Sequence, residues 1–147
     1  MIFFKDFSVG TRGRFDVVDI TDDVLSVVQA SGVVNGAVLI FCPHTTCSVM
    51  VASDDPRLPE TLRSAMDQIA PEGEYYAHDD LEIRTENLVE NEPANAPAHI
   101  MNAVMGRASE SIPVIGGRPS LAPGQRVLFV ELDSPRSRQY CIQITGE

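Results

Sequence analysis

The apolar residues of this chain fall into runs with the spacing of strands near both ends and the spacing of helices in between. Residues 1–7 and 13–20 each predict a strand, and the unbroken apolar run 37–42 is typical of a strand in the middle of a sheet. Four further segments alternate or are rich in β-branched residues, and they predict strands at 46–52, 112–115, 126–132 and 139–145.

Helical spacing is found in three segments. Residues 22–31 begin after a possible cap at Thr21 and stop at Gly32. Residues 58–69 place an apolar side chain at every third or fourth position and follow a capping aspartate, Asp54 or Asp55. A third helix is expected to begin near Pro97, to end at Gly106 and to bury one face, formed by Ile100, Ala103 and Val104.

Between the second and third helices, residues 74–97 contain many acidic residues, three asparagines and few apolar side chains. Loops of more than about 12–15 residues within one domain are usually functional or disordered. Tyr75, Tyr76 and His78 at one end of this segment, and His99 just beyond the other end, favour a functional loop.

Length and composition limit the class of protein. A chain of 147 residues is typical of a single domain, 1–147, and no apolar run approaches the roughly 20 residues that span a bilayer. The formal net charge of -10 opposes binding to nucleic acid or to an anionic membrane. Three cysteines without regular spacing and an N-terminus without a basic leader predict a cytoplasmic protein.

The strongest chemical signal is the polar break at residues 43–48, which lies between two apolar strands and contains His44, Thr45 and Thr46. Burying polar groups without partners costs about 1–3 kcal/mol each, so these side chains are expected to meet a ligand or local backbone groups. The chain has 3 histidines, and the other two, His78 and His99, also have polar neighbours in the sequence.

Three imidazoles with an open position are a common donor set for a catalytic divalent metal. We therefore expect His44, His78 and His99 to hold a metal, zinc first and magnesium as the alternative. Their spacings of 34 and 21 residues match no short zinc motif, so each histidine also has a structural explanation. Cys47 is either a further sulfur ligand or a core residue.

Two carboxylates and one guanidinium complete the candidate site. Alternation places Glu131 on the same side of its strand as Val127 and Phe129, where it would be buried and would orient a histidine. Glu131 and Asp79 are the candidate catalytic bases. The basic pairs Arg12 with Arg14 and Arg136 with Arg138 suit either a phosphate or a solvated turn, and we assign Arg136 to the substrate together with Thr45 and Thr46.

At this point the sequence resembles the YjbQ family of secondary thiamine-phosphate synthases over almost its whole length. The matching segments, in order, are Asp19-Ile20-Thr21, Ser31-Gly32-Val33, Gly36, His44-Thr45-Thr46, Asp55-Pro56, Tyr76-Ala77-His78-Asp79, Asn95-Ala96-Pro97-Ala98-His99-Ile100, Ile112-Pro113-Val114, Gly124-Gln125-Arg126, Pro135-Arg136 and Gly146-Glu147.

The resemblance implies a compact α+β domain of packed mixed or antiparallel β-sheets, sandwich-like, with flanking helices, which assembles as a homotrimer. It also implies that the three histidines share a metal-binding cleft. The associated reaction joins a hydroxymethylpyrimidine diphosphate to a thiazole phosphate and releases diphosphate. The chain departs from the family pattern at Ala52, Ser53, Met101 and Gly124; these changes remove a carboxylate and a lysine from the site region but leave the imidazoles in place.

Three functions are consistent with these features. The first is a metal-dependent enzyme that acts on a small phosphorylated molecule, with thiamine-phosphate synthesis as the specific reaction. The second is a metal-assisted hydrolase with Glu131 or Asp79 as base. The third is a non-catalytic trimeric protein that binds a metal or an anion.

Overall fold

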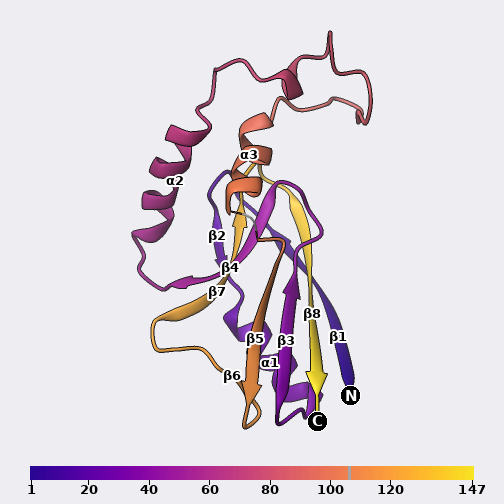
Figure 1. Cartoon of the computed structure of the whole chain (residues 1–147), viewed down its shortest axis with the longest axis vertical. Helices are drawn as coiled ribbons and strands as arrows, with labels where there is room; N and C mark the ends of the chain where they lie inside the picture. Colours follow the sequence, from indigo (N-terminus) through magenta and orange to yellow (C-terminus); the bar gives the residue numbers. More distant parts are fainter. Residues whose placement is uncertain (106) are drawn as a thin grey trace.

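The computed structural model describes residues 1–105 and 107–147, and it forms two β-sheets with three α-helices (Figure 1). The elements follow one another as β1 (Ile2–Gly10), β2 (Val17–Asp19), α1 (Thr21–Ser31), β3 (Gly36–Phe41), β4 (Cys47–Ser53), α2 (Leu58–Ile69), the 3-10 turn η1 (Ala77–Asp79), α3 (Ala96–Met105), β5 (Ser109–Ile115), β6 (Arg118–Pro119), β7 (Gln125–Glu131) and β8 (Ser137–Gly146).

The strands form a five-stranded sheet in the order β1-β8-β3-β5-β6 and a three-stranded sheet in the order β2-β7-β4. The paired strands of both sheets run antiparallel. The predicted apolar run lies at the centre of the larger sheet as β3, between β8 and β5, so its expected position is confirmed. The α+β fold of packed sheets with flanking helices is also confirmed.

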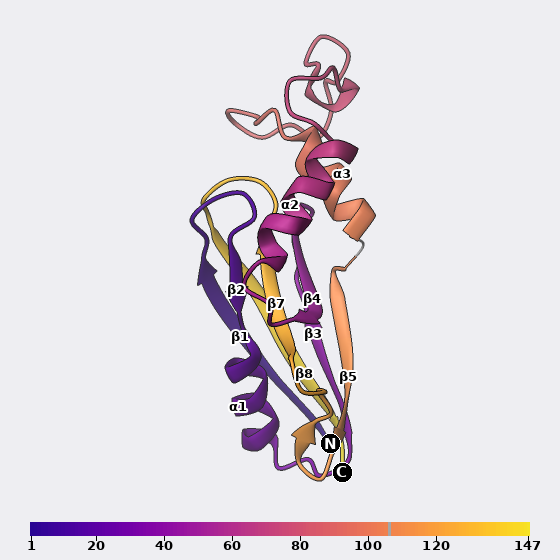
Figure 2. The same cartoon turned by 90° about the vertical axis from the view of Figure 1, so that its left-hand side faces the viewer.

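One core fills the space between the sheets and beneath α1, and it includes Val27 of α1, Ile40 of β3, Phe129 of β7 and Ile142 of β8. A second core lies on the other face of the smaller sheet, where Met66 of α2 and Met101 of α3 pack against it. Strand β7 is therefore buried on both faces. Figure 2 shows α2 and α3 beside the smaller sheet, with the segment between them extending beyond the ends of the strands.

Several local predictions are wrong because a tertiary contact replaces the expected one. Thr21 is not a cap: its hydroxyl accepts a hydrogen bond from Val127 N at 2.9 Å. The strand expected at 13–20 is reduced to β2 because the chain turns at Gly13, whose carbonyl accepts from Asp16 N.

The buried face of α3 also differs from the expected one. Ala96, Ala98 and Met101 are buried, whereas Val104 is 53% exposed. The helix packs on the smaller sheet through Met101, so the face with Val104 points away. The predicted stop at Gly106 lies outside the described residues.

The long loop is present and contains η1. Within it, the Arg84 guanidinium donates to the carbonyls of His78 and Asn87 and forms an ion pair with Glu92 at 2.6 Å. Because one side chain links three points of the segment, the loop has a defined shape despite its small share of apolar residues. Within the described residues, no helix has the length and apolar character needed to cross a membrane.

Candidate functional site

The polar break after β3 brings His44 beside the start of β8. Pro43 has no N–H to give to a neighbouring strand, so the chain leaves the sheet here and returns as β4. His44 Nε2 accepts a hydrogen bond from Gln139 N at 3.0 Å, which places the proton of the neutral ring on Nδ1. His44 therefore presents a donor, not a free lone pair, on its other nitrogen.

Beneath this turn, a buried ion pair joins the two sheets. Arg138 of β8 donates to both carboxylate oxygens of Glu131 of β7, at 2.8 and 2.6 Å, and to the Thr46 hydroxyl at 2.9 Å. Glu131 also accepts from the Thr11 hydroxyl at 2.7 Å and from Asp133 N at 3.1 Å. Every carboxylate oxygen and two sides of the guanidinium are thus satisfied inside the protein.

The buried position predicted for Glu131 is confirmed, since the residue is 0% exposed. Burial by itself raises the pKa of this carboxyl, but hydrogen bonds from Arg138, Thr11 and Asp133 N outweigh it and hold the pKa below the usual value. Glu131 contacts Arg138 and not a histidine. Cys47 lies in the same core, with its Sγ 3.7 Å from the nearer carboxylate oxygen.

The other two histidines lie together at the N-terminus of α3. The ring centroids of His78 and His99 are 4.6 Å apart. His78 Nδ1 lies 3.0 Å from Asp79 Oδ1, and the same oxygen accepts a hydrogen bond from Ala96 N at 3.0 Å. Asp79 therefore both caps α3 and orients His78, which leaves His78 Nε2 on the far side of the ring.

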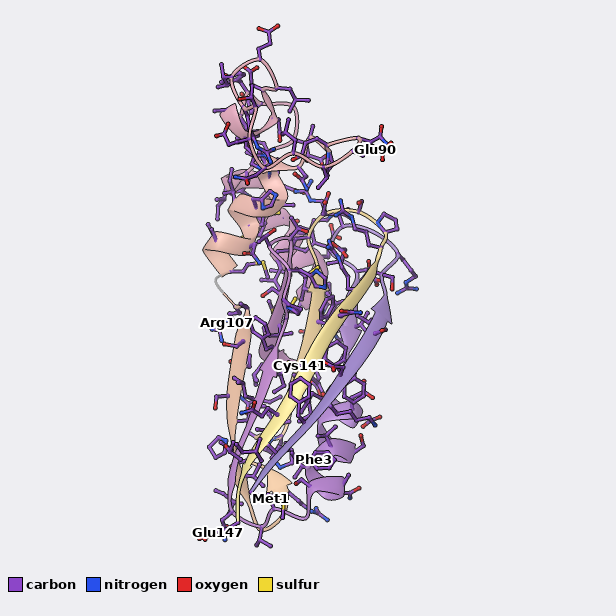
Figure 3. The ribbon with its side chains drawn as sticks, turned by 90° about the vertical axis from the view of Figure 1, so that its right-hand side faces the viewer. Met1, Phe3, Glu90, Arg107, Cys141 and Glu147 are labelled. Atoms are coloured by element: carbon purple, nitrogen blue, oxygen red, sulfur yellow. The ribbon has the colours of Figure 1, made fainter. Side chains whose placement is uncertain are left out.

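His44, His99 and Arg138 line one cavity of about 550 Å³, which we call the histidine pocket. Its walls come from the turn after β3, the loop before α3 and the start of β8, and they are formed by Pro43, His44, Thr45, Thr46, Val89, Glu90, Asn91, Pro93, Asn95, His99, Arg136 and Arg138. Figure 3 shows Glu90 on the loop at this end of the molecule. The fold thus brings together five of the predicted site residues in the lining of one pocket: His44, Thr45, Thr46, His99 and Arg136.

Both pocket histidines are biased toward the neutral form. Burial lowers the pKa of His44 and the charge of Arg138 lowers it further. Burial likewise lowers the pKa of His99, with a further contribution from His78. Neutral imidazoles in a polar pocket are suited to accept or relay protons near neutral pH.

The three histidines of the predicted metal centre do not form one ligand group in the described part of the chain. His78 and His99 are adjacent, but His44 uses Nε2 to accept from Gln139. Within residues 1–105 and 107–147, no group of three or more His, Cys, Asp or Glu side chains is placed to hold a metal ion. The three-histidine ligand set stays a prediction.

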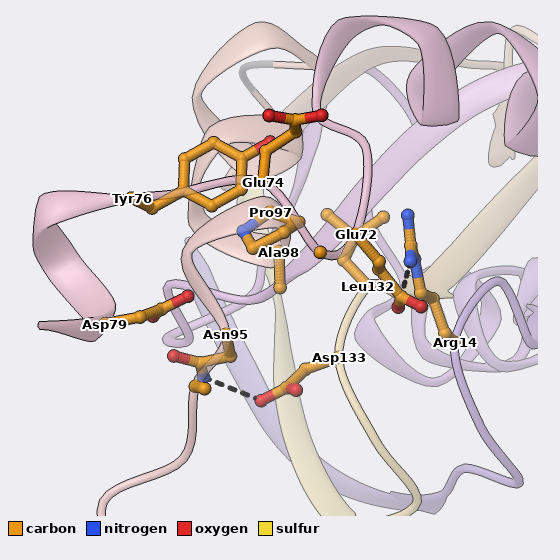
Figure 4. A pocket seen from close by; sticks show the side chains of 12 residues that line it. Arg14, Glu72, Glu74, Tyr76, Asp79, Asn95, Pro97, Ala98, Leu132 and Asp133 are labelled. Carbon is orange, nitrogen blue, oxygen red and sulfur yellow. Dashed lines mark hydrogen bonds and ion pairs between the residues drawn. The ribbon is translucent and has the colours of Figure 1, made fainter.

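A second cavity, of about 380 Å³, adjoins the first, and Asn95 lines both (Figure 4). We call it the acidic pocket because four carboxylates line it: Glu72, Glu74, Asp79 and Asp133. Asp133 Oδ2 accepts from Asn95 Nδ2 at 2.8 Å and from Arg136 at 2.6 Å. Asp133 thus holds both Asn95, which lines the two pockets, and Arg136, which lines the histidine pocket.

The predicted residues therefore fall into three places. The substrate candidates Thr45, Thr46 and Arg136 line the histidine pocket, and the candidate base Asp79 lines the acidic pocket. Glu131 lines neither pocket and is paired with Arg138. Their assigned roles stay predictions.

Neither Asn95, a candidate cap of the third helix, nor Asp133 was predicted as a site residue, and Arg138 was considered only as part of a basic pair with Arg136. Arg138 alternates with the inward residues Tyr140, Ile142 and Ile144 of β8, and that spacing was a signal for its burial.

Comparison with known proteins gives one consistent match. Residues 5–147 match the model of the family described as UPF0047 protein YjbQ-like. A UPF0047 protein of Archaeoglobus fulgidus is 31% identical over 94% of this chain and 98% of its own length. The UPF0047 protein YugU of Bacillus subtilis is 30% identical over 97% and 98%.

Solved structures agree with this match. A YbjQ-like protein of unknown function from Sulfolobus solfataricus has a TM-score of 0.85 at 31% identity and covers 100% of this chain and 99% of its own. The hypothetical protein APE1520 from Aeropyrum pernix has a TM-score of 0.83 at 35% identity and covers 99% of both chains.

Proposed function

This chain belongs to the YjbQ-like UPF0047 family, and from that premise and the pocket geometry we propose that it is an enzyme acting on a small phosphorylated molecule. The histidine pocket holds the phosphate or diphosphate group. The observation that carries the proposal is the meeting of His44, Thr45 and Arg136 in one cavity, although Arg136 lies far from the other two in the sequence.

The donors in this pocket suit an anion. The Nδ1–H of His44, the hydroxyl of Thr45 and the guanidinium of Arg136 all donate, and Arg136 is exposed enough to turn from Asp133 to a ligand. Arg138 contributes positive charge from the floor of the pocket while it stays bound to Glu131. A phosphate oxygen is the common ligand group that such a set of donors favours.

The histidine pair supplies a route for a proton. His99 lines the pocket, and the ring of His78 packs against the ring of His99. Asp79 fixes the orientation of His78. We infer that His99 takes or gives the proton during the reaction and that Asp79 acts as a positioning residue. Asp79→Asn, which keeps an acceptor for Ala96 N but removes the charge beside His78, should change the pH profile of the activity more than the affinity for substrate.

Phosphate binding is tested by calorimetric titration of inorganic phosphate and diphosphate into chelator-treated protein. Arg136→Ala should weaken binding about tenfold, which corresponds to the loss of one charge-assisted hydrogen bond of about 1.4 kcal/mol. Arg107→Ala is the matched control because Arg107 also pairs with a carboxylate three residues away, Glu110, outside the pocket. Equal effects of the two variants, or no binding to the wild type, contradict the proposal.

Thiamine-phosphate formation is the specific reaction to assay, because it releases diphosphate and the pocket would have to hold that leaving group. Purified protein is incubated with the pyrimidine diphosphate and the thiazole phosphate, with and without chelator, while its metal content is measured. Product that disappears on chelation supports the predicted zinc or magnesium dependence. Absence of product in every metal-loaded sample removes this reaction but leaves phosphate binding open to the titration.

We further propose that the chain forms a homotrimer through the outer face of the larger sheet. Five apolar side chains on this face are between 37% and 73% exposed: Ile2, Phe4, Leu39, Phe41 and Ile115. The strand register places these residues of β1, β3 and β5 on one side of the sheet, next to Cys141 of β8 (Figure 3). Exposed apolar patches of this kind mark interaction surfaces.

Sedimentation equilibrium checks the assembly. The wild type should sediment as three chains, whereas Phe41→Lys should sediment as one because it places a charge within the interface. Ile83→Lys serves as the matched control, since Ile83 is 61% exposed in the long loop, away from the sheet. A monomeric wild type rules out this interface.

A further inference from the structure

Two buried polar atoms without a hydrogen-bond partner occur in the described part of the chain, Asn95 Oδ1 and Arg14 Nε, and both residues line the acidic pocket. A buried acceptor or donor without a partner costs about 1–3 kcal/mol, and native proteins seldom keep one without a use. Both atoms belong to residues that line a single cavity, so a ligand bound there would supply the kind of partner that they lack.

The geometry of Asn95 shows which kind of hydrogen-bond partner its side chain lacks. The residue is 8% exposed, and its Nδ2 donates to Asp133 Oδ2 at 2.8 Å, which fixes the orientation of the carboxamide. Oδ1 is therefore an acceptor directed to the other side. Figure 4 shows the carboxamide between the carboxyl groups of Asp79 and Asp133. The missing partner of Asn95 is a hydrogen-bond donor.

Charge decides the class of donor. Glu72, Glu74, Asp79 and Asp133 line the pocket, and Arg14 is the one lining guanidinium among the described residues. Arg14 is already paired with Asp67 and Glu72 through its terminal nitrogens. Arg136 pairs with Asp133, so two guanidinium groups face four carboxylates. The pocket is thus negative, which opposes an anion and favours a cation. Its volume of about 380 Å³ lies at the lower end of the range for small-molecule sites.

We propose that the acidic pocket binds a small organic cation whose ammonium group donates to Asn95 Oδ1 and which also carries a neutral acceptor for Arg14 Nε. An amino alcohol or the amide of an amino acid has both groups. The site shares Asn95 with the histidine pocket but rests on its own geometry, so it does not depend on phosphate binding there.

The test uses glycinamide, which has an ammonium donor and a carbonyl acceptor, with acetate as the anionic control at the same ionic strength. Amide NMR shifts of 15N-labelled protein are followed during titration. Glycinamide should give saturable shifts around Asn95, Glu74 and Arg14, and acetate should give none. No saturable shift with glycinamide, or equal shifts with acetate, overturns the proposal.

Two matched variants locate the site. Glu74→Gln removes a charge from the acidic pocket and should weaken glycinamide binding several-fold. Glu90→Gln removes a charge from the histidine pocket and should leave the affinity for glycinamide unchanged. Both residues are exposed, so neither change threatens the fold. Equal weakening by the two variants would overturn the assignment to this pocket.

Asn95→Ala should abolish binding, provided that its amide spectrum remains that of the folded chain; glycinamide affinity unchanged in folded Asn95→Ala counts against the proposal. Inorganic phosphate is titrated into the same samples to separate the two proposals. Phosphate binding without glycinamide binding overturns only the amine site. Glycinamide binding without phosphate binding supports the amine site and contradicts only the proposed function.

Discussion

The two pockets that meet at Asn95 differ in how their polar groups are satisfied. Under the histidine pocket, both carboxylate oxygens of Glu131 have partners within the protein, and Arg138 donates from two of its nitrogens to Glu131 and Thr46. In the acidic pocket, Asn95 Oδ1 and Arg14 Nε have none. The difference teaches that the protein itself supplies the partners of the buried ion pair that links the two sheets, whereas the proposed amine would supply the partner that Asn95 Oδ1 lacks.

The largest expected effect comes from breaking the buried ion pair between Glu131 and Arg138. Glu131→Gln leaves Arg138 buried without a counter-charge, so the free energy of unfolding should fall by about 3–5 kcal/mol. Because domains are stable by only about 5–15 kcal/mol, this is a large share of the total. Urea denaturation measures the loss.

The double variant Glu131→Leu with Arg138→Met is the control for that loss. It removes both charges at once and should recover part of the stability, because no unpaired charge remains buried. A loss below about 1 kcal/mol in Glu131→Gln would falsify the view that this pair anchors the two sheets.

A smaller effect is expected at Asp79, which lines the acidic pocket and accepts a hydrogen bond from the start of α3. Asp79→Ala removes the acceptor for Ala96 N at the start of α3 and should cost about 1 kcal/mol. Asp79→Asn keeps an acceptor and should cost less. The two variants are compared by thermal unfolding, and equal losses would mean that capping is not the contribution of this side chain.

The pocket histidines predict a pH dependence in a known direction. The folded-state pKa values of His44 and His99 are lowered, chiefly by burial, so the unfolded chain binds protons first as the pH falls. Stability should therefore begin to decrease below a pH of about 6.5, the ordinary histidine value, and the loss should be complete below the folded-state pKa values. The double variant His44→Gln with His99→Gln should show a flatter curve between pH 8 and 5.5 in urea denaturation, and an unchanged slope would contradict the assignment.

The smallest expected effect on stability is in the acidic pocket. Glu74→Gln alters an exposed side chain of the acidic pocket and should change the free energy of unfolding by no more than about 0.5 kcal/mol. Urea denaturation of this variant sharpens the comparison, because a residue that affects amine affinity without affecting stability belongs to ligand binding alone. A loss as large as that of Asp79→Ala would show that the acidic pocket also supports the fold.

The sequence by itself determined the elements whose signals are local. The apolar run before Pro43 is a central strand, Gly32 ends α1 in the left-handed conformation with φ of 71°, and the acidic stretch before α3 is a loop. Alternation also placed Glu131 inside. These features depend on residues two to four positions apart, and their spacing is visible in the chain.

Tertiary structure alone decided which partners those residues meet. Thr21 was expected to cap a helix but contacts Val127, and the helix α3 buries Met101 in place of Val104. Arg138 and Thr46 are 92 positions apart and meet only because β8 and β4, which begins just after Thr46, belong to sheets packed on each other. The orphaned acceptor of Asn95 likewise exists because Asp133 holds the other side of its amide. Such contacts follow from the packing of whole sheets, which no short spacing in the sequence records.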